Sequence, residues 1–184
     1  MGKMNQTSGL EGEIFEPVCL HNDDLSKLNS PNPELALEKT HAAYKNIERI
    51  LPYVSYRIRE VLRKSGYPVP PYVIVPEIDF GTADLPQTIV NDNGRLTYKG
   101  IAMRITRGNG QRYQVDVNPK MAGASEEQFE YKALHEDFHA ILDAYDFPME
   151  KHDLYIEQWI DIHAAEALGK PELVETSKYI TKFN

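Results

Sequence analysis

The chain has 184 residues, enough for one domain that buries its own core without disulfide bonds. Its formal net charge of −8 disfavours broad nucleic-acid binding, because such binding depends on a basic surface. Its single cysteine, Cys19, excludes both a disulfide framework and a zinc site built from thiolates.

The N-terminal part, residues 1–30, mixes Gly, Ser, Asn and Asp without periodicity, and we expect a flexible tail there. Residues 31–184 are then expected to form one domain. Residues 1–16 lack the apolar core of a signal peptide, and no apolar run in the chain is long enough to cross a membrane. We therefore expect a cytoplasmic protein without a membrane partner.

Two helices are predicted next. Residues 34–51 carry apolar side chains at helical spacing, and Pro52 interrupts that pattern. A second helix should cover residues 53–64 and end at Gly66, since glycine readily adopts the left-handed conformation that follows a helix.

The middle of the chain predicts β-structure. Residues 72–75 form a short apolar run between prolines and are interpreted as a strand, and residues 81–87 as a loop. Residues 95–106 and 112–117 alternate weakly around a glycine-containing turn, which indicates a hairpin. We expect a small, mainly antiparallel sheet, so the fold class is predicted to be α+β.

Basic residues gather in this β region, against the single acid Asp116. They are Arg95, Lys99, Arg104, Arg107, Arg112 and Lys120. Such a stretch can contact phosphates, but it is more typical of a solvated strand face, and nucleic acid is not expected as a partner.

The motif with the most chemical content follows a predicted helix start at Ser125, where Gln128 completes a capping box. His135 and His139 lie four residues apart, with Glu136 beside the first, in an HExxH pattern. On a helix both imidazoles project from one face and can bind one metal ion, with the glutamate beside the open coordination position. The alternative is a pair of surface histidines on an acidic helix.

A catalytic zinc ion needs a third protein ligand. Leu142 and Tyr145 exclude the HExxHxxGxxH pattern, because they occupy the positions of its glycine and third histidine. A further helix is predicted over residues 152–168, and it carries Glu157 and Asp161 one turn apart. Taken alone, these two acids could equally form a solvated acidic face.

Glu157 and Asp161 together with HExxH resemble the site of gluzincin zinc metallopeptidases. Residues 115–119, 129–134 and 157–165 further resemble the ImmA/IrrE-like metallopeptidases, in which N-terminal helices and a small sheet precede the HExxH helix and a glutamate-bearing helix. The resemblance implies a zincin-like fold and one Zn²⁺ per chain. It assigns Glu157 as the third ligand, and Asp161 as an acid that hydrogen-bonds a metal-binding histidine.

The predicted function is zinc-dependent cleavage of a peptide or protein, with Glu136 as general base. Tyr155 and His152 are candidates for the donor that stabilises the oxyanion, whereas His163 is left out because it should point away from Asp161. An edge strand beside the HExxH helix could hold the substrate. The candidate residues are Arg112, Tyr113, Gln114, Val115, Asp116 and Val117.

Two other functions remain open from the sequence. The first is a non-catalytic regulatory or partner-binding protein on a metallopeptidase scaffold, and the second is a zinc hydrolase that acts on something other than a peptide. The retained Glu136 argues against the first, because a protein without catalysis has no chemical need for the base. The ImmA/IrrE-like resemblance implies a narrow protein target, but no residue in the chain identifies it.

Overall fold

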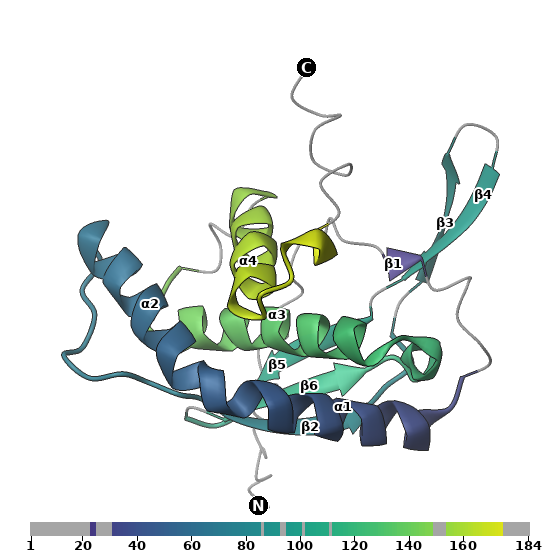
Figure 1. Ribbon diagram of the computed structural model, residues 1–184, viewed down its shortest axis with the longest axis horizontal. Coiled ribbons are helices and arrows are strands. Elements are labelled where there is room, and N and C mark those ends of the chain that lie inside the picture. The colour runs from purple at the N-terminus through teal and green to yellow at the C-terminus, as the bar shows by residue number, and fades with distance from the viewer. Residues whose placement is uncertain are drawn as a thin grey trace, which may run out of the picture.

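The computed structural model describes residues 23–24, 31–85, 87–92, 95–100, 102–110, 112–148 and 154–174, which form an α+β fold as predicted (Figure 1). The helices, including short 3-10 helices labelled η, are α1 Pro33–Ile47, η2 Glu48–Ile50, α2 Leu51–Lys64, η3 Pro119–Gly123, α3 Glu126–Ala144, α4 Leu154–Ala167 and η5 Pro171–Leu173. The strands are β1 Asp23–Asp24, β2 Glu77–Thr82, β3 Gln87–Asp92, β4 Arg95–Gly100, β5 Met103–Arg107 and β6 Arg112–Val117. Of the expected tail, residues 1–30, only β1 lies among the described residues.

The two predicted N-terminal helices are confirmed as α1 and α2. The Asn32 side chain caps α1 by accepting the Leu35 N–H at 3.0 Å. Pro52 stands in the first turn of α2, where a missing N–H costs no hydrogen bond, so α2 begins at Leu51. After α2, Gly66 has a φ of +84°, the left-handed conformation expected of a glycine at this place.

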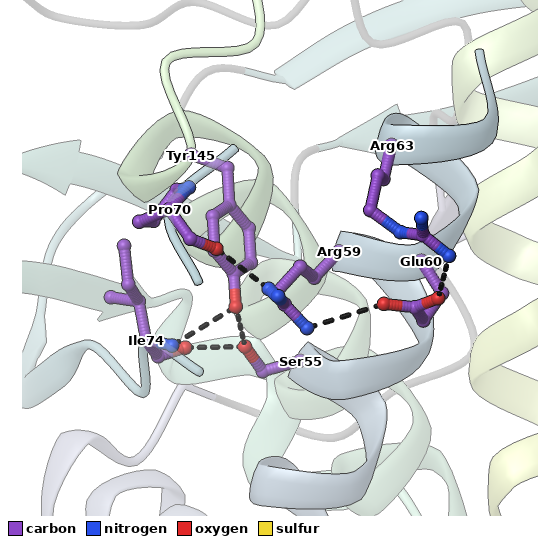
Figure 2. A network of polar contacts seen from close by, with 7 residues as sticks. All are labelled: Ser55, Arg59, Glu60, Arg63, Pro70, Ile74 and Tyr145. Atoms are coloured by element: carbon purple, nitrogen blue, oxygen red, sulfur yellow. Dashed lines mark hydrogen bonds and ion pairs between the residues drawn. The ribbon is translucent and has the colours of Figure 1, made fainter. Parts of the chain in front are cut away.

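The predicted strand at residues 72–75 is wrong, because this segment pairs with side chains and not with another strand. Ile74 donates its N–H to the Tyr145 hydroxyl at 2.9 Å, and its carbonyl accepts from the Ser55 hydroxyl (Figure 2). The Tyr145 and Ser55 hydroxyls lie 2.8 Å apart, which closes a buried ring of hydrogen bonds. Ile74 therefore satisfies both of its backbone groups without a sheet, and β2 begins only after Pro76.

A second set of contacts holds the same loop against α2. Arg59 donates from Nε to the carbonyl of Pro70 at 2.7 Å (Figure 2). Its Nη1 lies 3.2 Å from Glu60, which also pairs with Arg63 at 2.8 Å. The loop before β2 is thus fixed by one buried hydroxyl network and one arginine.

The sheet that supports the site has the strand order β2-β6-β5 and is mixed, whereas a mainly antiparallel sheet was predicted. β6 pairs antiparallel with β5, which confirms the 112–117 arm of the hairpin, but it pairs parallel with β2. Alternate residues of β6 are buried and face α1 and α3. On the same face, the Phe80 ring of β2 packs edge-on against Tyr44 of α1, with ring centroids 4.8 Å apart.

The predicted strand at residues 95–106 is two strands in two different sheets. β4 pairs along its whole length with β3 and, through Lys99 and Gly100, with β1, so the order of the second sheet is β1-β4-β3. β5 begins at Met103 and joins the other sheet. Alternation of side chains identifies a strand but not its partner, so the change of sheet was invisible in the sequence. Figure 1 shows the β3–β4 hairpin projecting away from the helices.

Three of the basic residues noted in the sequence form ion pairs with carboxylates. Arg104 lies 3.3 Å from Asp116, and Arg112 lies 2.8 Å from Glu77. Arg107, on the other face of the main sheet, lies 3.4 Å from Asp143 of α3. Each of these three arginines therefore has a carboxylate partner in the fold.

Helices form the remaining layers. α1 and α3 pack on each other and on one face of the main sheet, and α4 packs on the opposite side of α3 (Figure 1). Within the described ranges, no helix combines the length and apolar character needed to span a membrane.

Candidate metal centre

α3 carries the HExxH motif, and its start is the one that the sequence predicted. Ser125 accepts the Gln128 N–H at 3.3 Å, and the Gln128 side chain accepts the Ser125 N–H at 3.0 Å, so the capping box is complete. All side chains from Ala133 to Asp143 are buried, because α1, the sheet and α4 surround the helix.

The two histidines of the motif point into this enclosed region. His135 is 4% exposed and His139 is 2% exposed, which rules out the alternative of two surface histidines. Their Nε2 atoms lie 3.0 Å apart, as expected for residues one helical turn apart on one face.

α4 brings the two predicted acids to the same place. The Glu157 carboxylate is fully buried, and its oxygens lie 3.3 Å from His135 Nε2 and 3.5 Å from His139 Nε2. One turn later, Asp161 Oδ1 lies 2.9 Å from Nδ1 of His135. The two acids therefore face α3, and the alternative of a solvated acidic surface is wrong.

The three donor groups fit a single metal ion. In a tetrahedral site with zinc–ligand bonds of about 2.0–2.1 Å, neighbouring donor atoms are separated by about 3.3 Å. The two Nε2 atoms lie 3.0 Å apart, one Glu157 oxygen lies 3.3 Å from His135 Nε2, and the other Glu157 oxygen lies 3.5 Å from His139 Nε2. With one ligand atom taken from each residue, all three atoms lie within 4.8 Å of one another. The set of two imidazoles and one carboxylate can therefore hold one metal ion.

Hydrogen bonding prepares His135 for this role. Because an ionised carboxylate only accepts hydrogen bonds, the contact with Asp161 places a proton on Nδ1 and directs the Nε2 lone pair toward the metal position. Burial disfavours the charged imidazole, but hydrogen bonds to Asp161 and Glu157 outweigh burial and raise the pKa of His135 to about 10. A metal ion must therefore compete with a proton for Nε2.

Two more acids of α3 lie beside the ligands. Glu136, the predicted base, is 5% exposed and stands next to His135 in the chain. Burial, and then the charge of Glu136, raise the pKa of Asp137 well above its ordinary value. Asp137 therefore keeps a proton to higher pH than an exposed aspartate, which reduces the cost of an acid in the core.

The candidate oxyanion donors are not brought to the triad. Tyr155 is 66% exposed and stands two residues before Glu157, about 200° away around the helix, which argues against it. His152 lies outside the described residues. His163 pairs with Glu166 at 3.0 Å on the exposed side of α4, in keeping with its exclusion.

The predicted substrate edge is wrong, because β6 is the central strand of its sheet. β2 and β5 pair with it on either side, and this occupies its backbone groups. The expectation failed because the sequence gives no sign that β2 joins the sheet in parallel.

Sequence reasoning also missed Tyr131. Its hydroxyl donates to Asp161 Oδ1 at 2.5 Å, so it belongs to the hydrogen-bonded surroundings of the site. The available signal was its position four residues before His135, which places both side chains on one face of α3.

Comparisons with protein-family models, curated proteins and solved structures found no match. The chemical interpretation of this chain therefore rests on its own geometry. A buried His-His-Glu group on α3 and α4, with a glutamate beside the first histidine, is consistent with a zincin-like site.

Proposed function

We propose that this protein is a zinc-dependent peptidase of the gluzincin type. The observation that carries the proposal is the buried group of His135, His139 and Glu157, whose ligand atoms lie within 4.8 Å of one another. Two imidazoles and one carboxylate are the donor set of several catalytic zinc sites, in which the fourth position is left for water or substrate. One Zn²⁺ per chain is the proposed cofactor.

The reaction uses the chain's own groups around that ion. Bound zinc would lower the pKa of a coordinated water and polarise the substrate carbonyl. Glu136 takes the proton released as the water attacks and delivers it to the leaving amine. Asp161 keeps His135 in the tautomer that presents Nε2, as the 2.9 Å contact indicates.

A peptide substrate is favoured by the edge of the main sheet that runs along α3. Among the described residues β5 pairs only with β6, and it packs against α3. At the two ends of the β5–β6 pairing, the Asn118 N–H donates to the Ala102 carbonyl and the Gly108 N–H donates to the Arg112 carbonyl. By the alternation of antiparallel pairs, Met103, Ile105 and Arg107 turn their backbone N–H and C=O groups away from β6.

These outward groups supply what an extended peptide needs to add as a further strand. β5, in place of residues 112–117, is thus the proposed strand that holds an extended substrate. A non-peptide substrate would have no use for a row of backbone donors and acceptors.

The test is Glu136→Gln, with Glu127→Gln as the matched control. Both substitutions remove one carboxylate from α3, but Glu127 lies in the first turn and pairs with Lys170 at the surface. We expect zinc at one per chain in all three proteins, and cleavage of a peptide library, read by mass spectrometry, in the wild type and the control. Glu136→Gln should cleave at least about 100-fold more slowly, because general-base catalysis contributes about 10²–10⁴-fold.

Each of the other possible outcomes contradicts one part of the proposed function. Unchanged cleavage by Glu136→Gln would refute the assigned base. Wild-type protein that carries zinc and cuts no peptide or protein substrate would favour the regulatory, non-catalytic alternative. Wild-type protein without zinc would refute the metal centre itself.

A further inference from the structure

Tyr131 forms an additional layer behind the metal ligands. It lies on α3, one turn before His135, and its side chain is 8% exposed. Its hydroxyl donates to Oδ1 of Asp161 at 2.5 Å. The same oxygen accepts from Nδ1 of His135 at 2.9 Å.

Two donors on one carboxylate oxygen restrict the orientation of Asp161. Hydrogen bonds are directional, so the carboxylate cannot turn about its side-chain bonds without lengthening at least one of them. Both donors come from α3 and the acceptor comes from α4, so the arrangement also ties the two metal-bearing helices together. Charge-assisted hydrogen bonds of this kind are shorter and stronger than neutral ones.

Without the tyrosine hydroxyl, Asp161 would keep its contact with His135 but lose the restraint that Tyr131 places on its rotation. The ring plane of His135 would then be less well defined, and so would the direction of its Nε2 lone pair. Groups that orient metal ligands in this way typically affect metal affinity by about 10–100-fold.

We propose that Tyr131 is a positioning residue for the metal centre, which acts through Asp161 to hold His135 with Nε2 directed at the ion. The inference rests on the proposed function in one respect, namely that His135, His139 and Glu157 bind zinc. It assigns to Tyr131 no contact with the substrate or with the reacting atoms.

The structure offers a matched control. Tyr113 is a second buried tyrosine, 3% exposed, whose hydroxyl donates to a carboxylate of α3, Asp143, at 2.6 Å. Tyr113→Phe and Tyr131→Phe therefore remove the same group from similar surroundings, but only Tyr131 contacts the hydrogen-bond partner of a metal ligand.

The experiment measures the Kd for Zn²⁺ by competition with a chromophoric chelator, using the full chain. Tyr131→Phe should raise the Kd about tenfold, at the lower end of the range for groups that orient ligands. Tyr113→Phe should stay within about twofold of the wild type. Denaturant unfolding in excess chelator should show that both variants fold and lose similar stability, since each loses one buried hydrogen bond.

A double-mutant cycle tests the route through Asp161. If Tyr131 acts by orienting that carboxylate, Tyr131→Phe should have no further effect on zinc affinity in an Asp161→Asn background. The visible absorption of the Co²⁺-substituted protein should also change in Tyr131→Phe and not in Tyr113→Phe, because the spectrum reports ligand geometry.

The outcomes separate this inference from the proposed function. Wild-type protein that binds zinc, with Tyr131→Phe at the same Kd, would overturn the inference and leave the metal centre standing. Equal weakening in both phenylalanine variants would overturn it too, since the effect would then be one of general stability. Wild-type protein that binds no zinc would overturn the metal centre and the inference together.

Discussion

The affinity for Zn²⁺ should depend steeply on pH, because a metal ion must displace a proton from His135. Asp161 and Glu157 hold the pKa of this imidazole at about 10, above its ordinary value of 6.5. Below that pKa, binding at Nε2 releases one proton, so the Kd should rise tenfold for each unit by which the pH falls. Between pH 8 and pH 6 the Kd should rise about 100-fold, which corresponds to about 2.7 kcal/mol.

Isothermal titration calorimetry in buffers of different ionisation enthalpy measures this proton directly. Near pH 7.5 we expect about one proton released per Zn²⁺ bound, where an imidazole of ordinary pKa would release about a tenth of one. A Kd that does not change between pH 7 and pH 9, with no proton released, would refute the reasoning. It would mean that His135 is neutral and that the contacts with Asp161 and Glu157 do not hold a proton on it.

The metal-free protein should show the opposite trend in stability. The folded-state pKa of His135 is raised, so its contribution to stability is complete below pH 6.5 and is lost as the pH rises toward 10. The raised pKa of Asp137 acts in the same direction, because the folded chain keeps a proton that the unfolded chain releases above about pH 4. Urea unfolding in excess chelator should therefore give a free energy of unfolding that decreases from pH 6 to pH 9.

One substitution tests the third metal ligand, and another tests the hydrogen-bond network around Ile74. Glu157→Ala should weaken Zn²⁺ binding by more than the about 10–100-fold typical of an orienting group, since it removes a direct ligand. Stoichiometric zinc at unchanged Kd in that variant would move the third ligand to another group, such as His152 or Asp161. Tyr145→Phe should lower the free energy of unfolding by about 1–3 kcal/mol, because the buried N–H of Ile74 loses its acceptor. Tyr53→Phe is its control, because Tyr53 is 61% exposed on α2. Equal free energies of unfolding for the two variants would contradict the network.

Much of the candidate site was predictable because its geometry is local. Ser125 and Gln128 mark the start of α3, and the four-residue spacing of His135 and His139 places them on one face of any helix. The same argument placed Glu157 and Asp161 together on α4. The distances among these groups agree with the expected ligand set. The spacing alone did not predict that α4 meets α3 at this face; that expectation came from the resemblance to the gluzincins.

The errors in the β region concern partners that are distant in sequence. The apolar residues 72–75 were interpreted as a strand, but Ile74 bonds to the hydroxyls of Ser55 in α2 and of Tyr145 directly after α3. Residues 95–106 alternate weakly in polarity and were interpreted as one strand, yet the two halves of this stretch join different sheets. A short apolar run or an alternating pattern indicates that a segment can be buried. It does not indicate which other segment of the chain will pair with it.

The sequence by itself determined that α1, α2, α3 and α4 exist, where α3 starts, and which chemical groups α3 and α4 carry, because capping and the helical period depend only on residues a few positions apart. Tertiary structure alone decided that β2 enters beside β6 in parallel, which leaves β5 at the edge along α3. It also decided that Tyr131 and Asp161, on helices that meet only in the fold, share one hydrogen bond behind His135. These contacts depend on how whole elements pack, since packing joins residues that no local rule connects.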